Sequence, residues 1–259
     1  MHQLLEGKNG IIFGALDEKS IAWQVALQAH SEGANLVLSN APVALRLGTV
    51  KELALQCNVP LIAADATKME DLADLYHQSL QYFGGKIDFI LHAIGMSPNI
   101  RKGYPYTALD YNYYHQTIDI SAMSLHKLLQ AAIEADAFND YASVVALSYI
   151  AAQKTFANYG DMADAKAMLE SIARNFGYYL GKQKKIRVNT LSQSPTKTTA
   201  GAGIKGFDNF YDYADKMAPL GNANAEDCAK FCVMLFSDYS RMLTMQNIYH
   251  DGGFSTTGM

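Results

Sequence analysis

Short apolar segments rich in β-branched residues alternate along this chain with segments of helical periodicity. The apolar segments read as strands, and the seven of them begin at residues 10, 35, 60, 86, 143, 186 and 246. The segment SIAWQVALQAHSEG, from residue 20, is the first predicted helix, and Ser20 is expected to cap its start. The alternation predicts an α/β fold: a doubly wound, mainly parallel sheet of about seven strands with helices on both faces.

Composition limits the number of domains, the cellular compartment and the classes of partner that are expected. The 259 residues include no Pro/Ser-rich linker and no charge run, so one domain, residues 1–259, is expected. The net charge of −4, with both signs mixed, argues against a nucleic-acid partner. The first residues lack the pattern of a signal peptide, and no apolar run is long enough to cross a bilayer, so we expect a cytoplasmic protein without a membrane partner. The three cysteines and seven scattered histidines form no metal-binding pattern, and no metal site is expected.

In such sheets, ligands bind beyond the carboxyl ends of the strands, near the point where the strand order reverses. The first strand runs into FGALDEKSIAW, which places Gly14 and a helix N-terminus at this edge, where backbone N–H groups suit a pyrophosphate. The usual G-x-G-x-x-G pattern is absent, so an ordinary turn capped by Ser20 is an equal alternative. The second strand ends at residues 39–41 without the carboxylate of a typical NAD enzyme, and Arg46 is either a phosphate ligand or a solvated helix residue. NADH is therefore only weakly favoured over NADPH.

The third and fourth predicted strands end at Asp65 and Gly95, and each residue has two interpretations. Asp65 either caps the next helix or contacts an adenine together with Ala66. Gly95 either permits a turn or lets the backbone approach a dinucleotide. The sequence does not decide between them.

The segment LSYIAAQKTFANYGDMADAKAML contains three residues suited to proton handling. Tyr149 follows the fifth strand, and Tyr159 and Lys166 fall in the next helix, separated by about two turns, or roughly 10 Å, on nearly the same face. Both can therefore reach one ligand at different heights. YYLGK, at 178–182, contains the Y-x-x-x-K spacing of common short-chain alcohol dehydrogenases, but it lies about 28 Å beyond Tyr159 along a continuous helix. We interpret it as an accidental match.

Segments across nearly the whole chain resemble one family. They are GALDEKSIA, DFILHAIGMSPN, LSYIAAQKTFANYGDMADAKAMLESIAR, RVNTLSQSPTKTTAGAGI and YHDGGFS. Together they are similar to the enoyl-acyl-carrier-protein reductases of bacterial fatty-acid synthesis, the NADH-dependent, Y-x(6)-K branch of the short-chain dehydrogenase/reductase superfamily. The resemblance implies a Rossmann-like domain that reduces the trans-2 double bond of enoyl thioesters, the last reductive step of fatty-acid elongation. It also implies an acyl-carrier protein as partner and a homotetramer.

The resemblance also assigns residues to roles. The catalytic residues it implies are Tyr149, Tyr159 and Lys166. The cofactor-binding residues it implies are Gly14, Ser20, Ile21, Asp65, Ala66, Ile94, Gly95, Lys166 and Thr196. The substrate-binding residues it implies are Met96, Tyr149, Tyr159, Ile204 and Phe207. Ala93 stands where relatives often carry Ser, and Ala41 where many carry a polar residue, so NADH is expected without NADPH being excluded.

These roles give a mechanistic hypothesis. Tyr159 donates a hydrogen bond to the enolate oxygen formed by conjugate reduction, and Lys166 holds the cofactor ribose. The seven-residue spacing separates the two roles because the hydride lands two atoms from the carbonyl carbon. Tyr149 shapes the acyl entrance or relays a proton, the alternative being an aromatic residue in the core.

The segment from about residue 195 to 218 combines glycines with apolar residues and is expected to be a substrate-binding lid, the alternative being a plain helical hairpin. Two other functions stay open: a ketoreductase of the same superfamily, and a catalytically silent dinucleotide-binding regulator.

Overall fold

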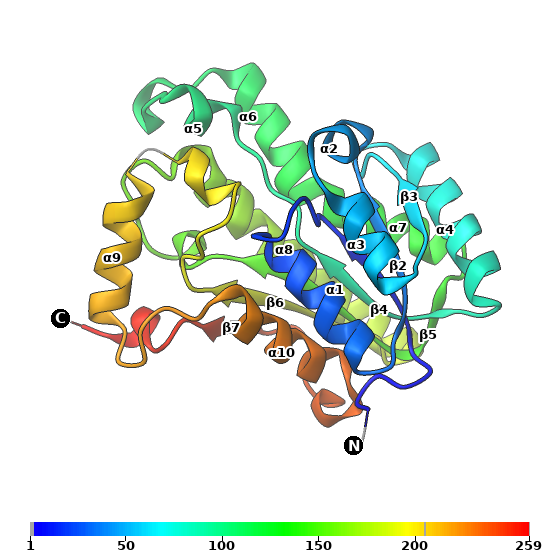
Figure 1. Ribbon diagram of the computed structural model, residues 1–259. Helices are drawn as coiled ribbons and strands as arrows, with labels where there is room; N and C mark the ends of the chain where they lie inside the picture. The colour runs from blue at the N-terminus through cyan, green and yellow to red at the C-terminus, as the bar shows by residue number, and fades with distance from the viewer. Residues whose placement is uncertain (1–2, 205, 259) are drawn as a thin grey trace.

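The computed structural model describes residues 3–204 and 206–258, which fold around a seven-stranded sheet (Figure 1). The strand order is β3-β2-β1-β4-β5-β6-β7, and every neighbouring pair is parallel. The strands are β1 (Asn9–Phe13), β2 (Asn35–Asn40), β3 (Leu61–Ala63), β4 (Ile87–His92), β5 (Phe138–Ser148), β6 (Arg187–Gln193) and β7 (Asn247–His250). Each of the seven predicted strands is present, and the predicted doubly wound parallel fold is confirmed.

Successive side chains of the central strands enter two different cores. Ile11 and Phe13 of β1 pack on one side of the sheet, whereas Ile12 packs on the other. The same alternation separates Ile90 from Phe89 in β4. Because both faces are covered, both sets of side chains must be apolar, which explains the uninterrupted apolar runs in the sequence.

Helices cover the two faces in separate layers (Figure 1). The layer on one side consists of α1 (Ile21–Ser31), α3 (Val50–Cys57) and α10 (Ala225–Phe236). The layer on the other side consists of α4 (Met69–Phe83), α7 (Ser124–Glu134) and α8 (Gly160–Lys184). No helix in these described ranges is both long enough and apolar enough to span a bilayer.

The remaining helices belong to the connections that follow β2, β4 and β6. They are α2 (Pro42–Leu47), α5 (Pro98–Lys102), α6 (Tyr111–Ile118) and α9 (Phe207–Met217). A π-helical turn, Asp119–Met123, joins α6 to α7. Short 3₁₀ turns complete the elements: Tyr106–Ala108, Ile150–Ala152, Gly201–Gly203 (η4), Asp238–Ser240 (η5) and Phe254–Thr256.

The strand order reverses between β1 and β4, and the two strand ends touch there. Gly14, directly after β1, has a φ of 98°, and a Cβ added to it would lie 2.1 Å from the carbonyl oxygen of Ala93. Any side chain at position 14 would therefore clash with the backbone that follows β4. This reversal point is where an open α/β sheet places its ligand crevice.

Candidate active site

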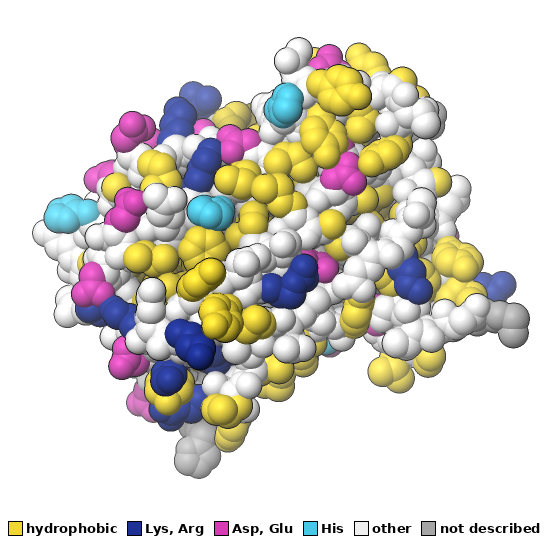
Figure 2. All heavy atoms as spheres, turned by 180° about the vertical axis from the view of Figure 1, so that it is seen from behind, with side chains coloured by type: hydrophobic (Ala, Val, Ile, Leu, Met, Phe, Trp, Pro, Cys, Tyr) yellow, Lys and Arg dark blue, Asp and Glu magenta, His cyan; other side chains and the backbone are white. Residues whose placement is uncertain are grey.

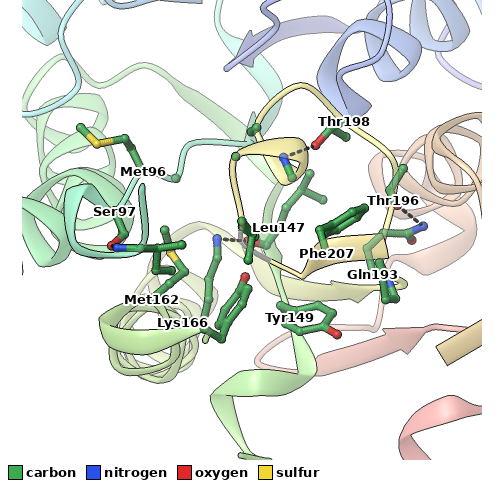
Figure 3. A pocket seen from close by; sticks show the side chains of 18 of the residues that line it. Met96, Ser97, Leu147, Tyr149, Met162, Lys166, Gln193, Thr196, Thr198 and Phe207 are labelled. Carbon is green, nitrogen blue, oxygen red and sulfur yellow. Dashed lines mark hydrogen bonds between the residues drawn. The ribbon is translucent and has the colours of Figure 1, made fainter. Parts of the chain in front are cut away.

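A cavity opens at the carboxyl edge of the sheet, between residues that follow β4, β5 and β6 and the first two turns of α8 (Figure 3). Ten of the residues proposed from the sequence line it: Ile21, Ile94, Gly95, Met96, Tyr149, Tyr159, Lys166, Thr196, Ile204 and Phe207. The fold thus brings together residues that are spread along the sequence from Ile21 to Phe207. Gly14, Ser20, Asp65 and Ala66 do not line this cavity.

Tyr159 and Lys166 reach the cavity from the same end of α8. Tyr159 occupies the N-cap position, and Lys166 lies two turns into the helix, with Met162 between them on the cavity side. The helix begins here because Asn158 and Gly160 both have a positive φ, at 67° and 48°, which breaks any regular structure before it. The prediction that Tyr159 falls within the helix is therefore wrong, because Tyr159 lies at the N-cap, before the positive φ of Gly160. Tyr159 and Lys166 nevertheless line the same cavity.

The Lys166 ammonium is held at the end of β5. Its Nζ donates a hydrogen bond of 2.7 Å to the carbonyl oxygen of Leu147, drawn in Figure 3. Burial lowers the pKa of Lys166 to about 8, and the negative charge of Glu170, one turn further along α8, acts in the opposite direction. The Glu170 carboxylate is itself buried and accepts hydrogen bonds from Ser148 Oγ (2.8 Å) and Gln153 Nε2 (3.2 Å). Lys166 thus loses its proton at a lower pH than an exposed lysine does.

Two phenols stand beside this lysine, with their ring centroids 5.1 Å apart. Burial raises the pKa of Tyr159, and burial followed by the nearby Tyr159 and Asp251 raises the pKa of Tyr149. Both hydroxyls therefore stay protonated near neutral pH and can donate. The Tyr149 hydroxyl is buried and has no hydrogen-bond partner among the described residues, and Figure 3 shows it directed away from Lys166.

The first turn of α1 borders the cavity through Ile21. The N–H groups of Ile21 and Ala22 have no partner within the helix, since a helix leaves its first amides unpaired. Ser20 occupies the N-cap position, but its hydroxyl donates to the carbonyl of Asp17 (2.7 Å) and accepts from Leu16 N–H (3.2 Å). The expected side-chain cap is therefore not made, because the preceding turn uses the hydroxyl. The free amides and Gly14 leave room for an anionic group.

Asp65 also has a local role that the sequence did not predict. Its Oδ1 accepts hydrogen bonds from the Thr67 N–H (3.0 Å) and hydroxyl (2.8 Å), while α4 begins at Met69 with Lys68 at its N-cap. The expectation that Asp65 caps the next helix is therefore wrong, since its carboxylate closes a turn instead. Contact of Asp65 and the buried Ala66 with an adenine stays a prediction.

Several cavity residues escaped the sequence analysis. They are Ser97, Ile100, Arg101, Leu147, Met162 and Gln193, among others, whereas Thr198 and Phe210 fall within the predicted lid. Gln193 is the last residue of β6, so it could have been predicted because ligands bind at the carboxyl ends of parallel strands. Its Oε1 lies 2.7 Å from His250 Nδ1. Met162 could have been found from its position three residues after Tyr159. Ser97, Ile100 and Arg101 gave no such signal.

The alternative pair of the sequence analysis lies far from the cavity. Tyr178 and Lys182 belong to the last turns of α8 and do not line the cavity, and 51% of Tyr178 is exposed. The Lys182 ammonium lies over the Tyr178 ring at 5.6 Å. This pair is therefore a surface contact. Within residues 3–204 and 206–258, no three His, Cys, Asp or Glu side chains gather as a metal site would require.

Comparisons with known proteins agree with one another. A family model described as enoyl-(acyl carrier protein) reductase matches residues 14–255. Enoyl-[acyl-carrier-protein] reductase [NADH] 1 of Rhizobium meliloti is 33% identical over 99% of this chain and 93% of its own length. The corresponding enzyme of Aquifex aeolicus is 32% identical over 99% of this chain and 94% of its own. The crystal structure of a FabI–NADH complex from Alistipes finegoldii is 57% identical, with a TM-score of 0.98 over 99% of this chain and 91% of that one.

Proposed function

The chain belongs to the enoyl-(acyl carrier protein) reductase family, and from this premise we propose that it reduces the trans-2 double bond of enoyl-acyl-carrier-protein thioesters with NADH. This is the last reductive step of fatty-acid elongation. The observation that carries the proposal is the joint placement of Tyr159, at the N-cap of α8, and Lys166, two turns into this helix, in one cavity at the point where the strand order reverses.

The residues at this point fit a dinucleotide. Gly14 keeps the turn after β1 free of a side chain, and the unpaired amides of Ile21 and Ala22 can bind a pyrophosphate. Lys166, held by the Leu147 carbonyl, can donate a second hydrogen bond to a ribose hydroxyl. NADH, when bound, supplies a hydride to the β-carbon of the substrate. Ser20 is proposed to join Gly14 and Ile21 at the pyrophosphate. The proposed adenine contacts are Asp65 and Ala66, Ile94 and Gly95 border the adjacent ribose, and Thr196 approaches the nicotinamide end.

Tyr159 stabilises the charge that the reaction creates on the substrate. Conjugate reduction leaves an enolate, and a hydrogen bond to its oxygen is stronger in the transition state than in the ground state. The raised pKa keeps the Tyr159 hydroxyl protonated as a donor. Tyr149, packed between Phe156 and Phe210, shapes the acyl side of the cavity with its ring.

The acyl chain occupies the apolar part of the cavity. Met96, Ile204 and Phe207 line that part, and the last two belong to the proposed lid at about residues 195–218. Closing an apolar lid over the chain excludes water from the reacting atoms. An acyl-carrier protein delivers the thioester, and the enzyme works in the cytoplasm as a homotetramer.

The test measures loss of NADH absorbance on addition of crotonyl-coenzyme A, beside parallel assays with NADPH and with acetoacetyl-coenzyme A. Enoyl-dependent oxidation is expected. In Tyr159→Phe, kcat should fall roughly 10²- to 10³-fold, as for other lost oxyanion donors, while NADH affinity is unchanged because the phenol does not hold the cofactor.

Each other result points elsewhere. Oxidation with the ketone only would make the protein a ketoreductase, and NADH binding without any oxidation would make it a silent regulator. A Tyr159→Phe enzyme with the wild-type kcat would remove Tyr159 from the mechanism while leaving the reductase activity established.

A further inference from the structure

A buried carboxylate next to the cavity takes no part in the mechanism above. Asp161, the second residue of α8 and two positions after Tyr159, is fully buried. Its oxygens accept hydrogen bonds from Ser97 Oγ (2.6 Å), Asn99 Nδ2 (2.7 Å) and Thr117 Oγ1 (2.8 Å). All three donors are also buried. In the part of the chain that the structure describes, Asp161 forms no salt bridge.

A carboxylate that is buried without a positively charged partner loses hydration free energy. Three neutral donors and the positive end of the α8 dipole compensate for the lost hydration. An apolar side chain would fill the position without this cost, but it would leave the Ser97 hydroxyl and one N–H of Asn99 without their acceptor, whereas Thr117 Oγ1 could still donate to the Tyr113 carbonyl oxygen (2.9 Å). We therefore attribute to Asp161 mainly the fixed positions of Ser97, Asn99 and Thr117, and only a small contribution to the free energy of unfolding.

The three donors belong to one stretch of chain, between β4 and the π-helical turn. Ser97 Oγ also accepts from the N–H of Ile100 (3.0 Å), which caps α5. Asn99 exchanges two further hydrogen bonds with the backbone of Asp110, at 3.0 and 3.2 Å. Asp161 is thus the point on α8 to which α5, the loop before α6, and α6 itself are tied.

This stretch forms one wall of the cavity. Met96, Ser97, Ile100 and Arg101 line it, together with Tyr159 and Lys166 (Figure 3 labels Met96, Ser97 and Lys166). A second attachment lies before Ser97, where the Ser121 hydroxyl accepts from the Met96 N–H (2.9 Å) and donates to the Met96 carbonyl (3.1 Å). Two polar attachments therefore flank the wall, and Asp161 joins it to the helix that carries Tyr159.

We propose that Asp161 is a positioning residue that sets the distance between this wall and Tyr159, and so controls binding of the enoyl substrate. The proposal rests on the proposed function, because the wall is argued to border the acyl group. Asp161 touches neither substrate nor cofactor. Its removal should weaken substrate binding and leave cofactor binding intact, since none of the residues proposed to hold NADH, Ile94 and Gly95 after β4 included, is hydrogen-bonded to Asp161 or to its three donors.

The test compares Asp161→Asn with Asp164→Asn. An Asn at position 161 has one acceptor oxygen, and its amide N–H groups would face at least one of the three donors. Asp164 is the matched control: it lies three residues on in α8, accepts a hydrogen bond from Tyr106 (3.2 Å), and does not line the cavity. KM for crotonyl-coenzyme A should rise about tenfold in Asp161→Asn, roughly the loss of one good hydrogen bond to a charged group, with NADH Kd unchanged.

A second variant, Thr117→Val, and amide hydrogen exchange test the same proposal independently of Asp161→Asn. Thr117→Val removes a single donor without altering size, and should raise KM less but in the same direction. Amide hydrogen exchange should quicken across residues 96–104 in Asp161→Asn and not in Asp164→Asn. If Asp161→Asn does not fold, Thr117→Val and its exchange pattern give the answer.

Wild-type KM in a folded Asp161→Asn or Thr117→Val enzyme, with only the melting temperature lowered, would overturn the proposal. So would an equal loss of NADH affinity, which would place the effect at the cofactor. If the wild-type protein does not reduce crotonyl-coenzyme A at all, the proposed function fails, and the exchange data still decide whether Asp161 holds the wall.

Discussion

At the scale of single residues, Lys166 shows how position changes chemistry. Burial among apolar residues of α8 lowers its pKa to about 8, with Glu170 acting against the shift. A lysine with a folded pKa below its unfolded value binds fewer protons in the folded protein at alkaline pH. Its burial therefore costs folding free energy below pH 8, and this cost disappears as the pH rises towards 10. The same shift makes the ammonium lose its proton within an accessible pH range.

We expect NADH affinity to depend on pH through this group. Below about pH 7 the ammonium is intact and Kd should be constant, whereas above about pH 8 Kd should rise severalfold as the donor charge is lost. Fluorescence titration with NADH from pH 6.5 to 9.5 measures this. Lys166→Met should bind NADH more weakly, with a flat profile. A flat profile in the wild-type protein would mean that bound cofactor does not favour the protonated form of Lys166.

At the scale of elements, η4 and α9 form the least anchored part of the cavity. Of the eleven residues of α9, only Ala214 is buried, although Phe207 and Phe210 lie at the cavity. Figure 1 shows α9 standing at the side of the molecule, away from the two helical layers. Two hydrogen bonds from Asn222, to the Tyr211 carbonyl (2.9 Å) and to Asp215 Oδ1 (2.8 Å), and the contact of the Phe210 ring with Phe156 hold α9. Few buried contacts favour local opening.

If this segment is a lid, ligands should protect it from proteolysis. Chymotrypsin should cut the free protein after Phe207, Phe210 or Tyr211, and NADH with a non-reacting acyl-coenzyme A should slow this severalfold. Cleavage after Tyr239, which is 81% exposed in η5, provides the control for a general effect on stability. Equal slowing at both places, or none at the lid, would favour a plain helical hairpin.

At the scale of the whole molecule, the outer face of the helical layer formed by α4, α7 and α8 exposes apolar side chains between α7 and α8, whereas the exposed side chains of α4 are mainly polar. Figure 2, which views the molecule from behind, shows hydrophobic side chains gathered over this face. A groove between α7 and α8 is lined by Ile133, Met168, Ile172 and Phe176, with Tyr179 62% exposed beside them. Exposed apolar patches of this kind mark interaction surfaces, and a symmetric pair of such faces can cover each other.

We expect the protein to have about four times its 28.4 kDa chain mass in light scattering coupled to size exclusion. Ile133→Asp should dissociate the assembly, because it places a charge in the apolar groove. Leu55→Asp is the control, since Leu55 is 81% exposed on α3, in the opposite helical layer. Dissociation by both variants, or by neither, would argue against this face as the interface.

The sequence by itself determined the secondary structure elements, because each of them depends on a short stretch of backbone. Apolar runs specify the strands, and helical periodicity specifies the helix that carries Lys166, because both patterns repeat within a few residues. The alternation of strands and helices then predicts a parallel sheet, and Gly14, Ile94 and Thr196 follow strands at its carboxyl edge. The motif resemblance named the reaction, which no periodicity contains.

Tertiary structure alone decided which distant groups meet. Asp161 and its donors Ser97 and Asn99 are more than sixty residues apart, so no local pattern links them. Likewise, a lysine pKa depends on burial by surrounding chain, and Ser20 failed as a cap because the Asp17 carbonyl competes for its hydroxyl. Hydrogen bonds and desolvation act between neighbours in space, and neighbours in space are set only when the whole chain has folded.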